Sequence, residues 1–365
     1  MLHRWLALAL AAPLTVLVAG CPEEETTAPT ESPLAAPPEG QGFQFGTGEQ
    51  PVGPGEEVQN CYFFKVKDLM ADGKVESGMM NLHRVQIFQR EGSHHMNLFR
   101  VRTIVPGDEG LDPTKGPYLN KNGQGPCFKS TNWADWPLIA NTQIDGNLDW
   151  TFPDGVANKL DPEEYVMLQS HFVNASTQTT PEGAGEVLIN FWHLPDNEVV
   201  HEMGTLFATK QSIRVCQSNP SPTYSGSCQL AGAEQPITVV GANGHFHSRG
   251  KQFQMFSWDG VTTTQPADTA KFYESDKWDE PPMAIGDSLA QIQPNGGVFY
   301  TCSYQWQEPP AAIGCDGLNE FDRTVKMTSE DQLDCCYTFG PVVDKNEHCN
   351  IFVYYYPKSE DVNCF

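Results

Sequence analysis

The stretch "EYVMLQSHFV", residues 164–173, shows the pattern that decides the fold. It is a short run rich in β-branched and aromatic residues with a side-chain period of two, and turn-forming residues flank it. Six further stretches share this pattern: residues 60–69, 94–105, 186–194, 251–258, 297–306 and 348–356. No long helical periodicity is found in the sequence, so we predict an all-β protein built from antiparallel sandwiches.

The length of the chain favours two domains. Roughly 300 residues follow an extended N-terminal segment, which is long for one hydrophobic core and natural for two. Ser, Pro and Gly gather near Ser212–Gly226, and this composition is typical of a connection. We therefore predict two tandem β-sandwich domains, residues 59–211 and residues 212–365.

The N-terminus has the order of an export signal. Arg4 precedes a mostly apolar run that ends in Val18-Ala19-Gly20-Cys21. Because a cysteine follows the cleavage site, residues 1–20 are predicted to be a lipoprotein signal, with Cys21 acylated as the first mature residue. The alternative is a secretory signal with an incidental cysteine. The first interpretation predicts an exported protein that lipid alone anchors at the bacterial cell envelope, on the periplasmic or surface face of the outer membrane.

Residues 21–58 are rich in Pro, Glu, Thr and Gly and contain neither Lys nor Arg. A segment of this composition buries too little apolar surface to offset its ordering entropy, so we expect an acidic, disordered tether. The folded chain is then expected to begin near Asn60. No later stretch has the eighteen or so continuous apolar residues that a membrane-spanning helix requires.

The charge of the chain excludes some classes of partner. The formal net charge is −24 and no basic stripe is present, which argues against nucleic acid and against an anionic membrane surface. We expect a monomer that acts on a small-molecule or peptide substrate.

The cysteine content is typical of an exported protein. Of eleven cysteines, ten remain when Cys21 is set aside, and most of them are expected to form disulfides. Spacing alone does not define the pairs. Cys335 and Cys336 are too close to pair readily with each other, so each needs its own partner.

Five of the ten histidines stand in distinctive settings: His94, His95, His171, His245 and His247. In a strand, residues i and i+2 point to the same face, so His245 and His247 can converge on one ion while Phe246 turns into the core. Adjacent His94 and His95 point to opposite faces of a flat strand, and one metal can take both only at a bulge, at a strand end or through different ring nitrogens. The alternative there is a surface pair. We expect surface or core roles for His83, His193 and His201.

Four motifs add weight to these histidines: "GSHHMNLF" (92–99), "LQSHFVN" (168–174), "GHFHSRGKQF" (244–253) and "EHCNIFVYYYP" (347–357). Their order and spacing resemble those of the copper type II, ascorbate-dependent monooxygenases, which include peptidylglycine α-hydroxylating monooxygenase and dopamine β-monooxygenase. The resemblance covers residues 60–365. It implies two jelly-roll-like β-sandwich domains with one copper each, and hydroxylation of a substrate C–H bond by O2 with ascorbate or a similar one-electron donor.

The resemblance also implies two ligand sets. His94, His95 and His171 match the copper site that supplies electrons, and three imidazoles suit a copper ion that changes oxidation state. His245 and His247 match two ligands of the copper where oxygen binds. The family has a methionine as the third ligand, whereas this sequence has His348, and nothing around the alternative thioether of Met327 matches the motif. Three ligands remain, but imidazole serves Cu(II) better than a thioether does, which places hydroxylase activity in doubt.

The family pattern pairs Cys349 with Cys302. In the same style Cys364 is expected to pair with Cys216 or Cys228, and Cys61 with Cys127, while Cys315, Cys335 and Cys336 have no family counterpart.

Recognition of a peptide carboxylate is not expected. In the peptide-amidating relatives an arginine two residues before His-x-His holds that carboxylate, and this sequence has Asn243 there. A neutral amide cannot make the charged, two-pronged contact. Phe352 also replaces a tyrosine of the relatives, although Asn350 is retained.

Three functions therefore follow from the sequence. The first is a copper-dependent monooxygenase with His245, His247 and His348 at the catalytic copper. The second is an exported copper-binding or copper-buffering lipoprotein on the same scaffold. The third is a zinc-bearing or metal-free sandwich for adhesion or interaction.

Overall fold

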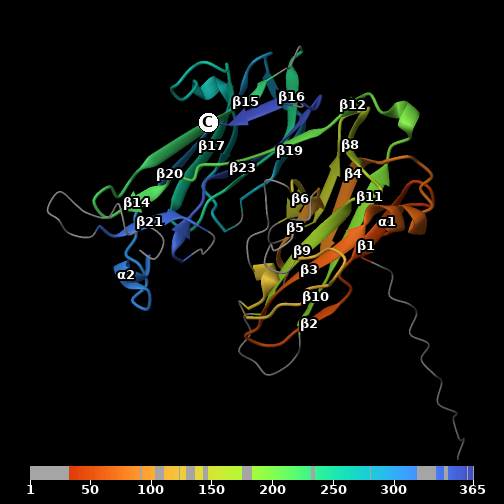
Figure 1. Ribbon diagram of the computed structural model, residues 1–365, viewed down its shortest axis with the longest axis horizontal. Helices are drawn as coiled ribbons and strands as arrows, with labels where there is room; N and C mark the ends of the chain where they lie inside the picture. Colours follow the sequence, from red (N-terminus) through yellow and green to blue (C-terminus); the bar gives the residue numbers. More distant parts are fainter. Residues whose placement is uncertain are drawn as a thin grey trace, which may run out of the picture. The chain divides into compact units, whose positions relative to one another are not determined.

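The computed structural model describes residues 33–90, 93–102, 111–122, 124–128, 136–142, 147–174, 183–231, 235–279, 281–318, 334–340, 344–359 and 361–364. Strands dominate these residues and form several sheets, nearly all of them antiparallel (Figure 1). The all-β prediction is confirmed. Residues Leu34–Phe365 form one compact unit, and the division into two sandwich domains stays a prediction.

A six-stranded sheet has the order β1-β11-β4-β8-β12, with β7 paired to β4. Within this sheet, as described, the pair of β8 and β12 is parallel and the other pairs are antiparallel. Its strands are β1 (Gly42–Gly46), β4 (Met80–Gln89), β7 (Leu148–Thr151), β8 (Val156–Leu160), β11 (Val187–His193) and β12 (His201–Glu202).

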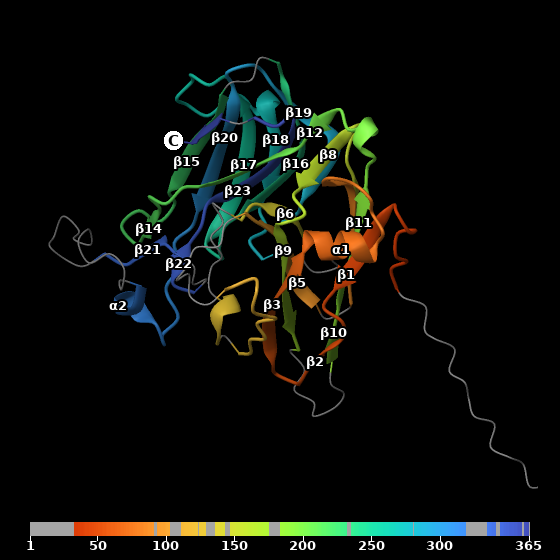
Figure 2. The ribbon, with the colours of Figure 1, turned by 45° about the vertical axis from the view of Figure 1, so that its right-hand side comes forward.

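A four-stranded antiparallel sheet has the order β3-β9-β5-β6 (Figure 2). Its strands are β3 (Glu57–Lys65), β5 (Ser93–Val101), β6 (Leu138–Thr142) and β9 (Tyr165–Val173). The short strands β2 (Gln50–Val52) and β10 (Gly183–Gly185) pair separately. The stretch 164–173 thus contains β9, an interior strand of this sheet.

The C-terminal half contains three more sheets. A four-stranded sheet has the order β13-β23-β16-β19, and a five-stranded sheet has the order β18-β17-β20-β15-β24. Their strands are β13 (Gly204–Thr209), β15 (Thr223–Ala231), β16 (Ile237–His245), β17 (Gly250–Trp258), β18 (Lys271–Ser275), β19 (Ala284–Ile292), β20 (Gly297–Tyr304), β23 (Asn350–Tyr356) and β24 (Asp361–Cys364). The third sheet contains β14 (Arg214–Cys216), β21 (Cys336–Phe339) and β22 (Asn346–Glu347).

Helices are few and short in the described part of the chain. The α-helices are α1 (Val66–Asp72) and α2 (Gly314–Leu318), and single 3-10 turns occupy Pro126–Phe128, Asp196–Glu198 and Asp268–Ala270. Among the described residues, no helix has both the length and the apolar character to cross a membrane.

Buried side chains form two large clusters. One draws on the six-stranded sheet and the sheet of β3, β5, β6 and β9, and it also includes Val240, Phe352 and Tyr354 from β16 and β23. The other draws on the two larger C-terminal sheets. In β16, eight of the nine residues are buried, because both faces of this interior strand are covered.

The structure differs from the expected tether of residues 21–58. Strand β1 pairs along its whole length with β11, and it buries Phe43 and Phe45. The ring of Phe45 lies 5.1 Å from that of Phe191. Folded chain therefore begins before Asn60, because two phenylalanines outweigh the polar composition around them. Residues 1–32, including Cys21 and the predicted signal, lie outside the described residues.

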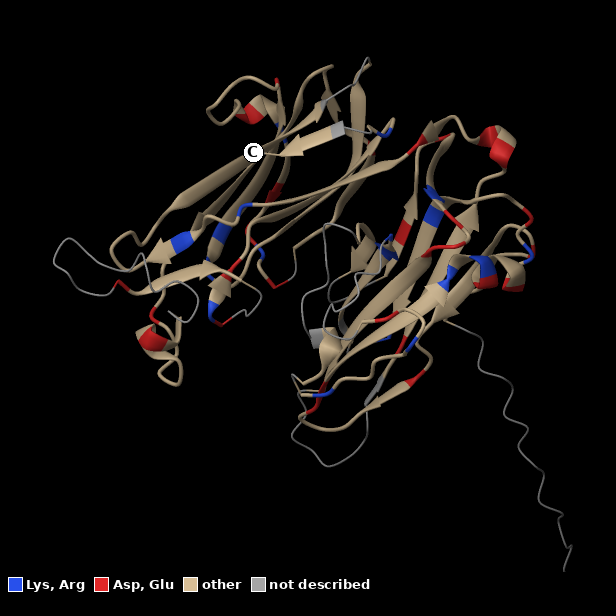
Figure 3. Ribbon diagram, in the orientation of Figure 1, with Lys and Arg blue, Asp and Glu red and all other residues tan. Residues whose placement is uncertain are grey.

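Positions of Lys and Arg and positions of Asp and Glu are interspersed along the ribbon (Figure 3). Most described ion pairs join residues far apart in the sequence and are at least partly exposed, for example Lys65 with Glu163, 98 positions apart. Such pairs contribute little to stability.

Candidate metal centre

Three histidines from two distant parts of the sequence meet at one place. His245 ends β16, His247 follows two residues later, and His348 lies just before β23. The ring centroids are 5.3 Å apart for His245 and His247, 5.6 Å for His245 and His348, and 4.4 Å for His247 and His348. One ring nitrogen from each lies within 4.8 Å of the other two. The predicted set His245, His247 and His348 is therefore a cluster.

The register of two strands brings the segments together. Strands β16 and β23 pair antiparallel, with His245 opposite Asn350. Phe246 is fully buried, as expected when the histidines on either side of it turn the other way. A turn follows, closed by the hydrogen bond from Gly250 N–H to the His247 carbonyl oxygen (2.9 Å). A Cβ atom on Gly250 would lie 1.9 Å from the Phe246 ring, so only glycine fits this turn.

A disulfide fixes the other segment. Cys349, next to His348, is fully buried and bonded to Cys302 of β20, with the Cα atoms 5.9 Å apart. The Tyr304 hydroxyl donates a hydrogen bond of 2.6 Å to the carbonyl oxygen of His348. The carbonyl group of His348 and the residue that follows it are thus both anchored to β20.

His247 is buried and His245 and His348 are partly buried, and this burial keeps the imidazoles neutral. It lowers the pKa of His245 to about 4. Burial, with His245 nearby, lowers the pKa of His348 to about 3. The pKa of His247 falls well below its ordinary range, chiefly through burial and then through the two neighbouring imidazoles. A metal binds neutral imidazole, so near pH 7 the ligands are already in the required form.

One tautomer of His247 is favoured. Its Nδ1 lies 2.8 Å from the carbonyl oxygen of Asn346, which can only accept a hydrogen bond. Nδ1 therefore carries the proton, and Nε2 has the lone pair that a metal binds. This is the usual arrangement around a metal-binding histidine.

The second predicted set is brought together in part. His95 on β5 stands opposite His171 on β9, and their Nδ1 atoms are 3.4 Å apart. The register shifts between Ser93 and His95, which is the kind of irregularity that a His-His pair needs in order to share an ion. The side chain of His94 lies outside the described residues. Met327, the alternative thioether, lies outside them as well.

A carboxylate completes the environment of His171. Nε2 of His171 lies 2.7 Å from Oε1 of Glu57, on the opposite side of the ring from His95. A carboxylate on one ring nitrogen leaves the other for a metal, and it orients the ring. Glu57 was not among the residues predicted for this site. Its position near His171 depends on the pairing of β3 with β9, which places Glu57 opposite Val173, and the sequence does not reveal this pairing.

Three amides form a network next to this pair. The side chains of Gln59 and Gln169 both donate to the carbonyl oxygen of Cys127, at 2.6 and 3.2 Å. Asn97 donates to Oε1 of Gln169 at 3.1 Å. Gln59 stands opposite His171, and Gln169 and Asn97 lie two residues from the paired histidines, so all share one face of the sheet. The network holds that face rigid.

Five disulfides link the described cysteines: Cys61–Cys127, Cys216–Cys336, Cys228–Cys364, Cys302–Cys349 and Cys315–Cys335. The expected pairs of Cys302 and Cys61 are present, and Cys364 takes Cys228 of its two candidates. Cys335 and Cys336 have separate partners, as expected. Cys216, Asp334 and Cys336 also lie close together, but the disulfide occupies both sulfur atoms.

The other histidines make structural contacts. His83 Nδ1 lies 2.8 Å from the Val156 carbonyl oxygen, and His193 Nδ1 accepts the Asn81 N–H at 3.3 Å. The ring of His201 lies beside that of Tyr356, at 5.5 Å. These contacts agree with the core and surface roles predicted for them.

Asn243 is used within the fold. Its side-chain amide is 1% exposed and donates to the carbonyl oxygens of Pro281 and Pro282, at 3.0 and 3.2 Å. Phe352, opposite Asn243, packs against Phe207 with the rings 5.2 Å apart. Neither side chain offers a charge to a carboxylate.

No protein-family model matches this chain, and no curated protein matches it.

Proposed function

We propose that this protein is an exported copper-dependent monooxygenase that hydroxylates a C–H bond of its substrate with O2 and a one-electron donor such as ascorbate. The observation that carries the proposal is the cluster of His245, His247 and His348, whose ring nitrogens lie within 4.8 Å of one another. The pair of His95 and His171, with Nδ1 atoms 3.4 Å apart, supports a second copper site completed by His94.

The donors fit copper. Both sites offer imidazole nitrogens, and the Irving–Williams order favours Cu(II) over the other divalent first-row ions at nitrogen donors. Bound copper would supply one-electron chemistry and a place for O2 to react. The role of the protein is to hold the imidazoles of the three-histidine cluster in place through β16, β23 and the Cys302–Cys349 disulfide. Burial keeps the imidazoles of His245 and His348 unprotonated.

The resemblance of the four motifs extends the proposal to architecture and location. It favours two jelly-roll-like domains, residues 59–211 and 212–365, with one copper in each. Multiple disulfides indicate an oxidising, exported environment. A lipid anchor on Cys21 and a monomeric state remain parts of the proposal.

A second function has one observation in its favour. His348 stands where the family has a methionine, and a third imidazole serves Cu(II) better than the thioether that favours Cu(I). A copper-binding or copper-buffering lipoprotein without hydroxylase activity would be expected to have such a site. A zinc protein would also accept three imidazoles.

Metal analysis and oxygen consumption separate these functions. Purified protein is loaded with copper, counted by elemental analysis and studied by EPR in the oxidised form, which detects Cu(II) and is silent for zinc. Ascorbate-dependent oxygen uptake with formation of a hydroxylated product supports the monooxygenase. Stoichiometric copper with no coupled oxygen uptake supports the copper-binding protein instead.

A further inference from the structure

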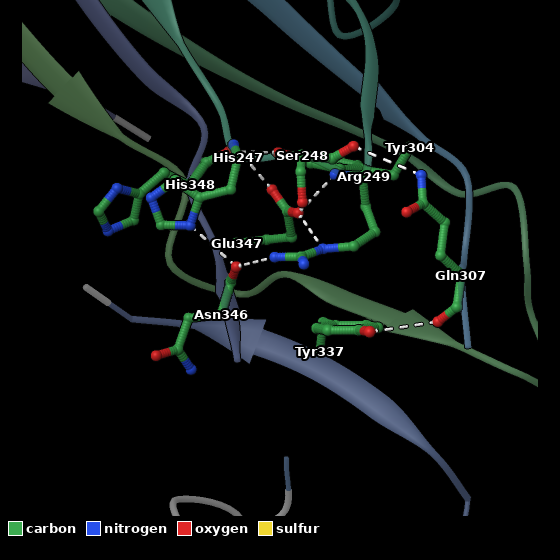
Figure 4. Close-up of polar contacts among 9 residues, drawn as sticks. All are labelled: His247, Ser248, Arg249, Tyr304, Gln307, Tyr337, Asn346, Glu347 and His348. Atoms are coloured by element: carbon green, nitrogen blue, oxygen red, sulfur yellow. Dashed lines mark hydrogen bonds and ion pairs between the residues drawn. The ribbon is translucent and has the colours of Figure 1, made fainter. Parts of the chain in front are cut away.

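A buried ion pair, Arg249 with Glu347, lies beside His247 and His348 of the three-histidine cluster (Figure 4). Nε of Arg249 donates a hydrogen bond of 2.6 Å to Oε1 of Glu347, and the two side chains are 4% and 0% exposed. Removing two charges from water is unfavourable unless they are paired and their remaining polar atoms are hydrogen-bonded. The partners of these atoms therefore show what the pair connects.

The carboxylate of Glu347 holds the loop that carries His247. Its Oε2 accepts the backbone N–H of His247 at 3.0 Å, and its Oε1 accepts the backbone N–H of Arg249 at 3.1 Å. The backbone of Glu347 directly precedes His348. The side chain of Glu347 thus ties the segment that carries His348 to the backbone of His247.

The guanidinium of Arg249 makes the reverse connection. Its Nη2 donates to the carbonyl oxygen of Asn346 at 2.6 Å, and the same oxygen lies 2.8 Å from Nδ1 of His247. The guanidinium also stacks over the ring of Tyr337, 4.1 Å from its centroid. Figure 4 shows the result, in which five hydrogen bonds join residues 247–249 to residues 346–347.

We propose that Arg249 and Glu347 are positioning residues for the three-histidine site. They fix the separation of the two segments that carry His247 and His348, and they present to the His247 ring the carbonyl oxygen that selects its tautomer. This inference rests on the metal-binding function proposed above. A paired charge suits the role better than an apolar contact, because hydrogen bonds are directional and set the register of two segments that no regular ladder joins.

The test uses the full chain carrying His171→Ala, so that only the three-histidine site reports. Arg249→Met and Glu347→Gln are each expected to weaken Cu(II) binding by about 10- to 100-fold, the range for residues that orient metal ligands. Both substitutions are also expected to change the EPR spectrum of the bound Cu(II). Arg249→Lys, which keeps the charge and loses the planar fork, is expected to fall between Arg249→Met and the parent.

Glu164→Gln is the matched control. It breaks another largely buried pair, in which Arg100 donates to both carboxylate oxygens of Glu164 at 2.7 and 3.0 Å. It is expected to lower the unfolding temperature and to leave the copper affinity unchanged. If the Arg249 and Glu347 variants behave like this control, with lower unfolding temperature but parental affinity and EPR spectrum, the positioning role is overturned.

Two further outcomes are distinguishable. Should Glu347→Gln fail to fold, the comparison of Arg249→Lys with Arg249→Met decides alone. If the His171→Ala chain binds no copper and the unmutated chain binds one ion at most, the proposed metal-binding function of the three-histidine cluster is itself wrong. The positioning role of Arg249 and Glu347 then falls with it.

Discussion

Nδ1 of His95 lies 3.4 Å from Nδ1 of His171, although 76 residues separate the two along the chain. Two nitrogens that bind one ion at about 2.0–2.1 Å each are typically separated by a distance of this order. The spacing of the pair matches that of two ligands of the proposed shared ion, and Glu57 holds His171 from the far side.

The first prediction concerns the copper content. His171→Ala removes a ligand from this pair, so the variant is expected to bind about one copper per chain where the parent binds two. Elemental analysis after gel filtration provides the count. His201→Ala, which changes a histidine beside Tyr356 and outside both clusters, is the control and is expected to keep the parental count. A His171→Ala protein that still holds two ions would contradict the assignment.

The second prediction concerns Glu57. In Glu57→Gln the acceptor on His171 Nε2 loses its charge, so the imidazole becomes a poorer donor through Nδ1. Copper affinity at this site is expected to fall by about 10- to 100-fold. Competition with a chromophoric chelator measures the fall.

The neighbouring variant Glu56→Gln is the control for it. Glu56 forms an ion pair with Lys121 and accepts a hydrogen bond from the backbone N–H of Gly53. These contacts, chiefly the one with Lys121, lower the pKa of Glu56. It makes no described contact with a histidine, so its copper affinity should equal that of the parent. Equal losses in both variants would point to a general effect of charge and would remove the specific role of Glu57.

The third prediction is a pH dependence of the metal-free protein. Burial lowers the pKa of His245 to about 4 and that of His348 to about 3, whereas both titrate near 6.5 when unfolded. Between these values the unfolded chain binds more protons, so stability is fully present above about pH 6.5 and is lost as the pH falls toward 4 and then 3. Since a tenfold change in proton affinity is worth about 1.4 kcal/mol, the loss is on the order of 3 kcal/mol for His245 alone by pH 4.

Urea unfolding at several pH values, with chelator present, measures this loss. His245→Gln is expected to flatten the curve between pH 7 and 4, because the variant has no proton to gain at that position. Parallel curves for the parent and the variant would show that His245 does not contribute, and would argue that it is solvated in solution.

Much of the fold was predictable because its signals are local. The period of two in residues 164–173 corresponds to β9, and that in 348–356 corresponds closely to β23. His245 and His247 were predictable as partners because alternation alone puts them on one side, with Phe246 buried between them. Composition misled at Phe43 and Phe45, where two buried aromatic rings within an acidic, Pro-rich segment form β1.

The surroundings of the histidines were not predictable from the sequence alone. Glu57 meets His171 through the pairing of β3 with β9, and Glu347 meets His247 through a loop contact across 100 positions. Such contacts depend on strand register and on chain crossings, which the residue pattern of one strand does not encode. The charges of Arg249 and Glu347, each set next to a histidine motif, were nevertheless visible and are rare for buried positions.

The last prediction separates a catalytic from a storage role at the three-histidine site. His348→Met restores the thioether that the resemblance leads one to expect. A soft sulfur donor stabilises Cu(I) relative to Cu(II), so the Cu(II)/Cu(I) potential is expected to rise, by about 59 mV for each tenfold change in relative affinity. Redox titration followed by EPR measures it, and ascorbate should reduce the variant more completely than the parent.

His348→Leu is the matched control, since leucine is similar in size to methionine and offers no donor atom. It is expected to lose copper from this site, whereas His348→Met retains it. If the site is catalytic, ascorbate-dependent oxygen uptake should persist or increase in His348→Met and vanish in His348→Leu. If the third imidazole serves storage of Cu(II), His348→Met should release Cu(II) more readily, and oxygen uptake should be absent from the parent and from both variants. Identical potentials and copper contents in the two variants would show that residue 348 is no ligand.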